Sequence, residues 1–409
     1  MITTINNKHK KLNVPNLRFP EFEGEWEEER LADIADLYKG TGISKDQLSD
    51  DGEPCILYGE LYTKYKSETI REVISKTNID NTKLVRSKAN DVIIPCSGET
   101  AEDIATARCV LNGNILLGGD LNIIRLHGYD GAFMSYQLNG RRKYDIAKVA
   151  QGVSVVHLYG EHLKGVKTIN PCLEEQKKIA KLLSLLDERI ATQNKIIDKL
   201  QSLIKGLNDF LYTQYGGEVL TSFAELGTSY SGLSGKSAQD FGSGKPFITY
   251  LNVYSNNVIK ENDFQYVAIK DDEKQNVVKY GDVLFTLSSE TPEEVGVGSV
   301  YLGKEKVYLN SFCFGIHITN TEVAFPPYLS YYVSLTAFRK FIYPYAQGST
   351  RFNLCKADFE KASIKLPTLA DQKRIYSVLG HIDCKIETER QMLNLYNSQK
   401  QYLLRQMFI

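Results

Sequence analysis

The sequence has no long apolar run, no paired cysteines and almost no net charge. No apolar stretch of about 18 residues occurs, and the polar start MITTINNKHKK has no apolar centre like that of a secretion signal. The seven cysteines are scattered and none forms a CxxC pair, which is typical of reduced thiols. We therefore expect a cytoplasmic protein with no membrane contact. The net charge of −1 means that any anion-binding surface is local.

Catalytic and metal-binding motifs are also missing or incomplete. The six histidines show no HExxH or zinc spacing. Gly235-Lys236-Ser237 resembles the end of a P-loop, but Tyr230 stands where that motif requires glycine. Phe325-Pro326-Pro327-Tyr328 resembles the (Asn/Asp)-Pro-Pro-(Tyr/Phe) motif of amino-methyltransferases, but Phe325 cannot accept a hydrogen bond from a target amine. We therefore expect a non-enzymatic chain that holds no metal and no cofactor.

What the sequence does have is a long heptad seam between residues 173 and 212. Its apolar residues recur in steps of three and four, which is the coiled-coil spacing, if Gln193 is counted as a polar layer. The seam residues are Ile179, Leu183, Leu186, Ile190, Ile197, Leu200, Ile204, Leu207 and Leu211. A helix of about 40 residues is about 60 Å long and needs an equally long partner.

A second seam lies 196 positions later in the same phase, with Glu389 in the place of Gln193. Its members are Ile375, Leu379, Ile382, Ile386, Glu389, Leu393, Tyr396, Lys400, Leu403 and Met407. Tyr396 and Lys400 are its weaker layers. Either helix alone would be an ordinary amphipathic helix, but two in register predict a pair that packs along its length. Because the first helix leads away from one domain to the next, the second must return antiparallel to it.

The segments before the two helices are also related. Residues 52–62 match residues 244–254, and residues 90–100 match residues 281–291. Ala150-Gln151-Gly152 recurs as Ala346-Gln347-Gly348. The sequence thus predicts an α+β protein with two similar mixed α/β domains and two long antiparallel coiled-coil helices, related by a pseudo-two-fold axis. The predicted segments are 1–170, 171–214, 215–366 and 367–409.

Two similar but unlike domains on a rigid rod suit a long ligand that is read at two places, and duplex DNA is such a ligand. The order of parts resembles the specificity subunit of a type I restriction-modification system. The resemblance is carried by VPNLRFPEFEGEWE, by a glycine, proline, strand and tyrosine order at 52–58 and 244–250, and by Gln-Gly at 151 and 347. The helix openings PCLEEQKKI and PTLADQKRI also carry it.

The resemblance implies a non-catalytic subunit with two target recognition domains. Each would read one half of a bipartite, asymmetric site in double-stranded DNA, across an unread spacer. The implied partners are two modification (methyltransferase) subunits and, in the full complex, two restriction subunits. S-adenosylmethionine, ATP and Mg²⁺ are expected on those partners.

Four groups of residues are candidates for contact with DNA. The first group lies in two glycine-rich loops, which suit phosphate, although a plain turn is an equal alternative. Its residues are Lys39, Thr41, Ser44 and Lys45 in the first domain and Ser231, Ser234 and Lys236 in the second. The second group lies at matched strand ends, where the two domains carry different side chains that could read bases, although strand tyrosines are more often packing residues. Its residues are Tyr58, Glu60, Tyr62 and Lys64 in the first domain and Tyr250, Asn252 and Tyr254 in the second.

The other two groups lie nearer the domain ends. Polar turns are the third, with a hairpin turn as the alternative: Ser97 and Thr100, with Ser288, Ser289 and Thr291. The Gln-Gly loops are the fourth: Gln151 and Ser154, with Gln347, Ser349, Thr350 and Arg351. Arg351 is the best single candidate for a guanine edge or a phosphate, and its counterpart in the first domain is Val155.

Two other functions compete with this one. A stand-alone DNA adenine methyltransferase recognition module would need a cofactor fold for which the chain has no room. A structural coiled-coil adaptor would have no DNA contact, and it would bind a target duplex no better than a random one.

Overall fold

The computed structural model describes residues 12–80, 82–152 and 155–409. By its internal contacts the chain divides into two compact units, which we describe separately. Unit 1 is Met1–Lys195 with Gln391–Ile409, and unit 2 is Ile196–Arg390. The sequence-based segments gave each long helix a region of its own, whereas the two units share each helix. No helix among the described residues has the length and apolar character needed to cross a lipid bilayer.

The two long helices are α7 (Leu173–Tyr215) and α13 (Leu369–Met407). Each begins two residues after a proline, Pro171 or Pro367, which ends the preceding strand. Every seam residue named above is buried or half-buried, including the polar layers Gln193 and Glu389. The predicted heptad seams are therefore confirmed.

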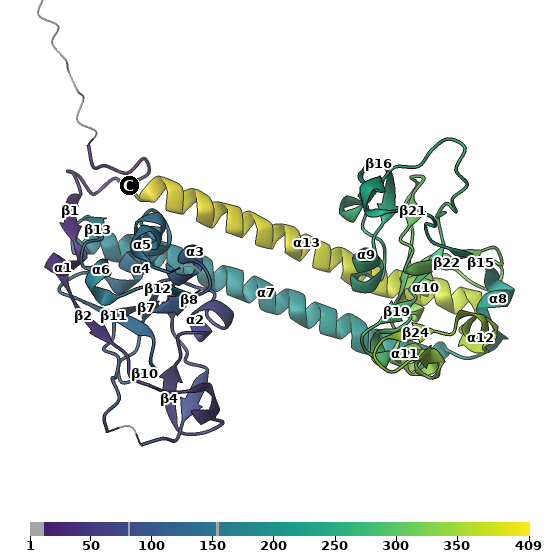
Figure 1. Cartoon of the computed structure of the whole chain (residues 1–409), viewed down its shortest axis with the longest axis horizontal. Coiled ribbons are helices and arrows are strands. Elements are labelled where there is room, and N and C mark those ends of the chain that lie inside the picture. The colour runs from purple at the N-terminus through teal and green to yellow at the C-terminus, as the bar shows by residue number, and fades with distance from the viewer. Residues whose placement is uncertain (1–11, 81, 153–154) are drawn as a thin grey trace, which may run out of the picture. The chain divides into compact units, whose positions relative to one another are not determined.

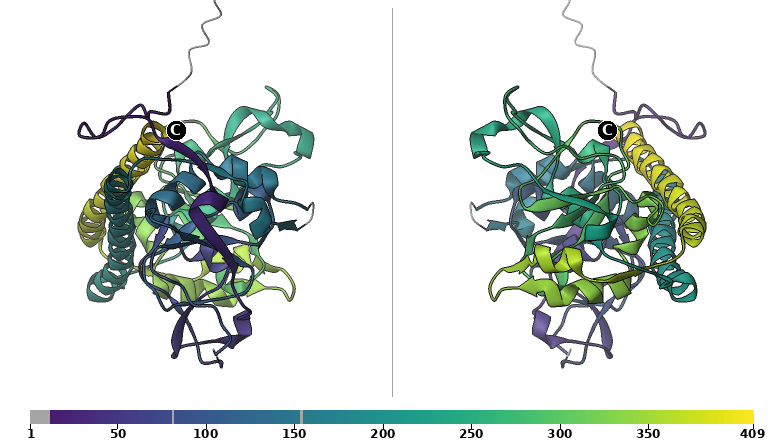
Figure 2. Two further views of the ribbon diagram at one scale, coloured as in Figure 1. Left: turned by 90° about the vertical axis from the view of Figure 1, so that its left-hand side faces the viewer. Right: turned by 90° about the vertical axis from the view of Figure 1, so that its right-hand side faces the viewer.

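Within unit 1 the two helices run in opposite directions. Lys400 of α13 lies against Asp187 of α7, with 2.7 Å between Lys400 Nζ and Asp187 Oδ1. Further along, Met407 shares a core with Ile179 and Leu183. Residue numbers therefore rise along one helix while they fall along the other, and the adjacent helices can be followed in Figure 1 and in the left view of Figure 2. The predicted antiparallel pair is confirmed.

Unit 1 is an α+β domain of short elements that precede α7. Its strands are β1 (Glu27–Arg30), β2 (Ala35–Lys39), β3 (Leu48–Ser49), β4 (Glu53–Ile56), β5 (Thr69–Ile70), β6 (Ser75–Thr77), β7 (Asp91–Pro95), β8 (Ser97–Gly98), β9 (Arg108–Val110), β10 (Leu116–Leu117), β11 (Leu121–Leu126), β12 (Val156–His157) and β13 (Lys167–Asn170). Its helices are α1 (Leu31–Ile34), α2 (Glu60–Thr63), α3 (Ala101–Ile104), α4 (Gly131–Asn139), α5 (Lys143–Val149) and α6 (Gly160–Leu163).

Unit 2 follows α7 with a similar order of elements. Its strands are β14 (Val219–Thr221), β15 (Gly227–Ser231), β16 (Phe241–Ile248), β17 (Gln265–Val267), β18 (Val283–Thr286), β19 (Ser288–Ser289), β20 (Gly298–Val300), β21 (Tyr308–Leu309), β22 (Cys313–Ile318), β23 (Ala346–Gln347), β24 (Phe352–Leu354) and β25 (Ile364–Leu366). Its helices are α8 (Phe223–Leu226), α9 (Tyr250–Ser255), α10 (Pro326–Tyr332), α11 (Thr336–Ile342) and α12 (Lys356–Lys361).

The main sheets of the two units share four strands in the same order, and the sheet of unit 1 has β5 as a fifth strand. The order is β2-β11-β7-β9-β5 in unit 1 and β15-β22-β18-β20 in unit 2. In unit 1, β11 pairs antiparallel with β2 on one side and with β7 on the other. In unit 2, β22 pairs in the same way with β15 and β18. A smaller sheet carries one parallel pair in each unit, β4 with β10 and β16 with β21. The duplication predicted from the sequence is thus a duplication of fold.

A buried glutamine explains why the two helix openings share the order Pro, acidic residue, Gln. Gln176 accepts a hydrogen bond from the Asp130 N–H at 2.9 Å and donates to the Pro171 carbonyl at 2.8 Å. Gln372 accepts from the Phe325 N–H at 2.8 Å and donates to the Pro367 carbonyl at 2.9 Å. Each glutamine therefore ties the first turn of its long helix to the loop before a helix of its own domain.

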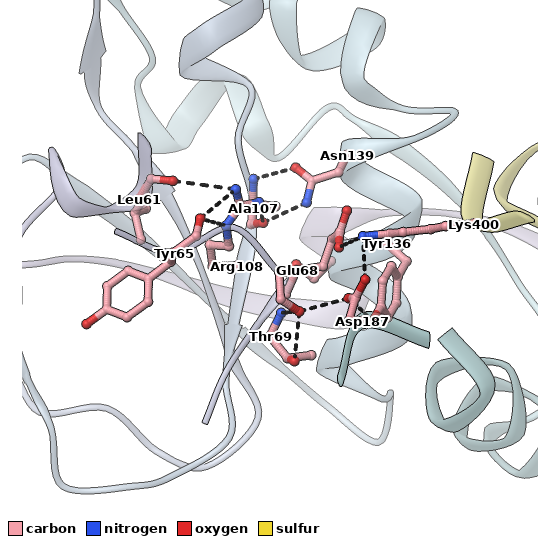
Figure 3. Close-up of polar contacts among 12 residues, drawn as sticks. Leu61, Tyr65, Glu68, Thr69, Ala107, Arg108, Tyr136, Asn139, Asp187 and Lys400 are labelled. Atoms are coloured by element: carbon pink, nitrogen blue, oxygen red, sulfur yellow. Dashed lines mark hydrogen bonds and ion pairs between the residues drawn. The ribbon is translucent and has the colours of Figure 1, made fainter. Parts of the chain in front are cut away.

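Lys400, a weak layer by its sequence, has a specific role in unit 1. Its ammonium lies 2.6 Å from Glu68 Oε2 and 2.7 Å from Asp187 Oδ1, and Tyr136 donates to Asp187 at 2.7 Å. Figure 3 shows Lys400 of α13 pointing into this group of side chains from unit 1 and α7. Burial disfavours the charged ammonium, but the two carboxylates outweigh it and raise the pKa of Lys400. The polar position therefore joins α13 to α7 and to the domain.

Candidate nucleic-acid interface

Each unit has a hollow at the same place in its fold. Hollow 1, of about 600 Å³, is lined by Tyr58, Tyr62, Ser97, Glu99, Asp103 and Val155. Hollow 2, of about 300 Å³, is lined by Tyr250, Tyr254, Ser288, Glu290, Glu294 and Arg351. The first five residues of each set match in order, and in type or charge. The last pair, Val155 and Arg351, does not.

Tyr62, Tyr250 and Tyr254 lie on short helices and Tyr58 lies in the turn just before one, which corrects the strand end predicted for them. Strand β4 ends at Ile56 and is followed by α2, while β16 ends at Ile248 and is followed by α9. On a helix, residues four apart share a face, whereas on a strand residues two apart do. Tyr250 and Tyr254 of α9 therefore line hollow 2 together, and the turn before α2 places Tyr58 beside Tyr62 in hollow 1.

Glu60 and Asn252 lie between the paired tyrosines in the sequence, and both side chains are buried inside their own units and do not line the hollows. Glu60 is 6% exposed and binds Lys64 Nζ at 2.7 Å, and Lys64 also donates to Ser75. Asn252 is 2% exposed, and its amide bonds the N–H and the carbonyl of Lys260. The predicted base contacts of Glu60 and Asn252 are therefore wrong for this fold, and Lys64 is engaged inside the unit.

A matched hairpin closes each hollow. Gly152 and Gly348 have φ of +123° and +143°, which favours glycine, and a Cβ at either would lie 2.1 Å from the carbonyl oxygen of Val155 or Arg351. The following strands pair with the hollow wall, β12 with β8 and β24 with β19. The hairpins therefore present Val155 and Arg351 in the same way.

The polar groups of hollow 2 are ordered by hydroxyl donors. Tyr254 donates to Glu294 Oε1 at 2.8 Å and Ser289 donates to Glu294 Oε2 at 3.0 Å. The tyrosine hydrogen bond is the main cause that lowers the pKa of Glu294, so this carboxylate is charged at neutral pH. The Tyr250 hydroxyl donates to the Ser288 carbonyl at 2.8 Å. Arg351 is exposed, and no described residue forms a hydrogen bond or an ion pair with its guanidinium.

Hollow 1 is ordered in a similar way but has no cation in the place of Arg351. Tyr62 donates to the Ser97 carbonyl at 3.1 Å. Thr100 caps α3, since its hydroxyl oxygen accepts from the Asp103 N–H at 3.0 Å, and it also donates to the Asp103 carboxylate at 2.6 Å. In unit 2 the equivalent Thr291 precedes the short turn Pro292–Glu294. Thr100 and Thr291 therefore help to place the acidic residues of the hollows.

The predicted glycine-rich loops lie outside the hollows, and their side chains differ in availability. Lys39 and Lys45 are exposed. Thr41 accepts from the Val85 N–H at 3.0 Å, and the Ser44 N–H donates to the Gln47 side chain at 2.9 Å. These two bonds make turn formation the better-supported reading of Thr41 and Ser44.

In unit 2 the corresponding loop has an engaged lysine. Lys236 Nζ lies 2.5 Å from Glu273 Oε2 and donates to the Ala268 carbonyl at 2.6 Å, and its side chain is 8% exposed. Lys236 is therefore an internal ion pair in this structure and not an open phosphate contact. Ser231 and Ser234 are exposed.

The remaining candidates belong to the hairpins. Gln151 and Gln347 are exposed and lie on the hairpin arms, opposite His157 and Asn353. Ser349 and Thr350 are exposed at the tip of the unit 2 hairpin. Ser154 lies outside the described residues.

The acidic members of both hollows were not among the residues predicted from the sequence. These are Glu99 and Asp103 in unit 1, with Glu290 and Glu294 in unit 2. The alignment of the two halves already placed Glu99 beside Glu290, so matched carboxylates next to candidate serines were the available signal.

The comparison with known families decides what kind of protein this is. A family model described as "Type I restriction modification DNA specificity domain" matches residues 23–202 and again residues 227–395. The chain belongs to this family. It is a type I restriction-modification specificity subunit, which recognises DNA and is not itself catalytic, as the sequence predicted.

Relatives of this specificity subunit agree with the family match. A Methanocaldococcus jannaschii protein described as the specificity subunit of the type I restriction enzyme MjaX is 26% identical, over 93% of this chain and 92% of that protein. The MjaVIII specificity subunit of the same organism is 29% identical over 48% of this chain and 44% of its own length.

Two solved structures share the fold. The type I restriction-modification S subunit from M. genitalium matches with a TM-score of 0.57 at 15% identity, over 97% of this chain and 99% of that one. A chain from a study of complex assembly and conformational transition in a type I R-M system matches with a TM-score of 0.56 at 15% identity, over 94% and 97%. As a member of the type I restriction-modification specificity family, the subunit acts with DNA and with partner subunits.

Proposed function

We propose that this specificity subunit reads a bipartite, asymmetric DNA site, with each unit reading one half. The observation that carries the proposal is the pair of hollows, which share their frame and differ in their side chains. Hollow 2 has Leu251 and Arg351 where hollow 1 has Gly59 and Val155. A common frame gives both units the same approach to a groove, and unlike side chains select different bases.

We propose further that the long helices bind the modification subunits. In unit 2, α7 exposes Ile196, Leu203 and Phe210 at seven-residue spacing, with exposures of 38%, 52% and 57%. In unit 1, α13 exposes Leu395 and Tyr402 at the same spacing. Apolar rows at heptad spacing suit the packing of a further helix. One such row in each unit supports a complex with two modification subunits.

The remaining parts of the proposal follow from this assembly. The helices of 43 and 39 residues set the length of the unread spacer. Two restriction subunits join the complex for cleavage. S-adenosylmethionine, ATP and Mg²⁺ belong to the partner subunits, and the complex acts on DNA in the cytoplasm.

Methylation mapping tests the proposal. The complete subunit is purified with its modification subunit, used to methylate a random-sequence DNA library, and the methylated motif is read by sequencing. We expect two short specified blocks separated by an unspecified gap.

Exchanging residues 1–170 for the same region of a homologue should then change one block only. A motif in which both blocks change would contradict independent units. Binding no better to a target duplex than to a random one, at fixed salt and with the partner present, would favour a structural adaptor.

A further inference from the structure

Given the proposed function, on which this step rests, we propose that unit 2 reads a G·C pair through hollow 2. Arg351 faces the guanine and a carboxylate of the hollow faces the cytosine. Hollow 1 has Val155 at the equivalent position and reads no guanine in this way. The difference in cationic donors lies at one pair of positions that matched hairpins present alike.

The groups that line hollow 2 are those that the major-groove edge of a G·C pair requires. Guanine presents two acceptors, N7 and O6, and cytosine presents one donor, its N4 amino group. A guanidinium only donates hydrogen bonds, and an ionised carboxylate only accepts them. Arg351, Glu290 and Glu294 line the same hollow. The donors and the acceptors therefore lie close enough together to serve one base pair.

Arg351 is available for this contact because no described residue forms a hydrogen bond or an ion pair with its guanidinium, and Glu294 is positioned by other donors. Each oxygen of the Glu294 carboxylate already receives one hydroxyl hydrogen bond, from Tyr254 or Ser289. These bonds hold Glu294 in place without using the guanidinium. Each carboxylate oxygen can accept a second bond, so the cytosine amino group has an acceptor as well.

A DNA phosphate is the other group that an arginine binds, and the surroundings of Arg351 disfavour it. Phosphate sites gather cations and backbone N–H groups. Glu290 and Glu294 instead put negative charge into the same hollow, where it repels a phosphate. Base edges carry no net charge, so the carboxylates direct the arginine towards a base.

Hollow 1 fits a different partner. Glu99 and Asp103 supply acceptors, and Val155 supplies no donor. This combination suits an exposed amino group, at adenine N6 or cytosine N4. The two hollows thus differ in the class of base that they select.

The test uses the complex of the complete subunit with its modification subunit on a random-sequence library. Its variants are Arg351→Val, which gives unit 2 the side chain of unit 1, and Arg351→Lys, which keeps the charge but loses the planar two-pronged donor. The matched control is Val155→Ala. Exchange of residues 1–170 identifies which half of the motif belongs to unit 2.

We expect both Arg351 variants to lose discrimination at one G·C position of the unit 2 half by about tenfold to a hundredfold, while the other half keeps its motif. Val155→Ala should leave the unit 2 half unchanged. An Arg351→Lys variant with full selectivity, or a uniform loss across all sequences, would show a phosphate contact and overturn the proposal. An unchanged motif in Arg351→Val would also overturn it. A wild-type complex without a two-block motif would refute the proposed function itself.

Discussion

The buried cluster around Lys400 makes a prediction about what joins the last helix to unit 1. Replacing Lys400 with alanine leaves the carboxylates of Glu68 and Asp187 without their cation. All three side chains are nearly buried, with exposures of 12%, 12% and 7%. Removing one partner of a buried ion pair typically costs about 3–5 kcal/mol, because the remaining charge stays desolvated.

The same geometry predicts a rescue. Asp187 also accepts from Tyr136 and from Ser67 at 2.7 and 2.8 Å, and an amide oxygen can accept the same bonds. The triple variant Lys400→Met, Glu68→Gln, Asp187→Asn removes the charges of these three side chains, keeps their approximate shapes and leaves the nearby Arg108 guanidinium in place. It should be more stable than Lys400→Ala and come within about 1 kcal/mol of the wild type, since buried ion pairs gain little over neutral groups of similar volume.

The pH dependence of the alanine variant follows from Glu68. Burial raises the pKa of Glu68, and Lys400 opposes the rise. Without Lys400 the pKa is higher still, so the folded protein binds a proton that the unfolded chain has already released. Stability then falls as the pH rises between the two values. The deficit of the alanine variant should be smaller at pH 5 than at pH 8.

Hydrogen–deuterium exchange read by mass spectrometry measures this effect unit by unit. We expect faster exchange in Lys400→Ala along α4 and the last turns of α13, and a loss of about 10 °C in the melting of unit 1. Unit 2 serves as the internal control. A loss below about 1 kcal/mol, or a deficit independent of pH, would refute the role assigned to the cluster.

Three further predictions concern the helices. Gln372→Ala leaves the Phe325 N–H and two carbonyls unpaired in unit 2 and should cost about 2–4 kcal/mol in denaturant unfolding; a cost below about 0.5 kcal/mol would contradict the tie. Leu203→Ser with Phe210→Ser should change the unfolding free energy of the free subunit by less than about 1 kcal/mol, yet weaken calorimetric binding of the modification subunit at least tenfold. Unchanged affinity would argue against that surface. One heptad inserted in each helix, after Gln193 and Glu389, should lengthen the mapped spacer by about 3 base pairs, since seven residues rise about 10 Å; an active complex with an unchanged spacer would show that the helices do not set it.

Much of the fold follows from local sequence. The heptad spacing from Ile179 to Leu211 determines which face of α7 is buried, because a helix repeats every 3.6 residues whatever surrounds it. Likewise Gly152 and Gly348 recur because both hairpins need a positive φ and a close backbone approach. Such requirements are met within a few residues, so they can be predicted from the sequence alone.

Tertiary structure decided which polar side chains are available to a ligand. Glu60 and Glu99 are the same residue type in one unit, yet Glu60 bonds Lys64 inside the fold and Glu99 lines a hollow. Lys400 and Arg351 differ in the same way, because Lys400 is paired inside the fold and Arg351 lines a hollow. The partner of Lys400, Glu68, lies 332 positions earlier in the chain, so the pairing cannot be read from local sequence. A heptad or a repeat specifies the face on which a charge lies. Whether that charge is paired depends on residues brought close only by folding, and the desolvation of each pair decides its strength.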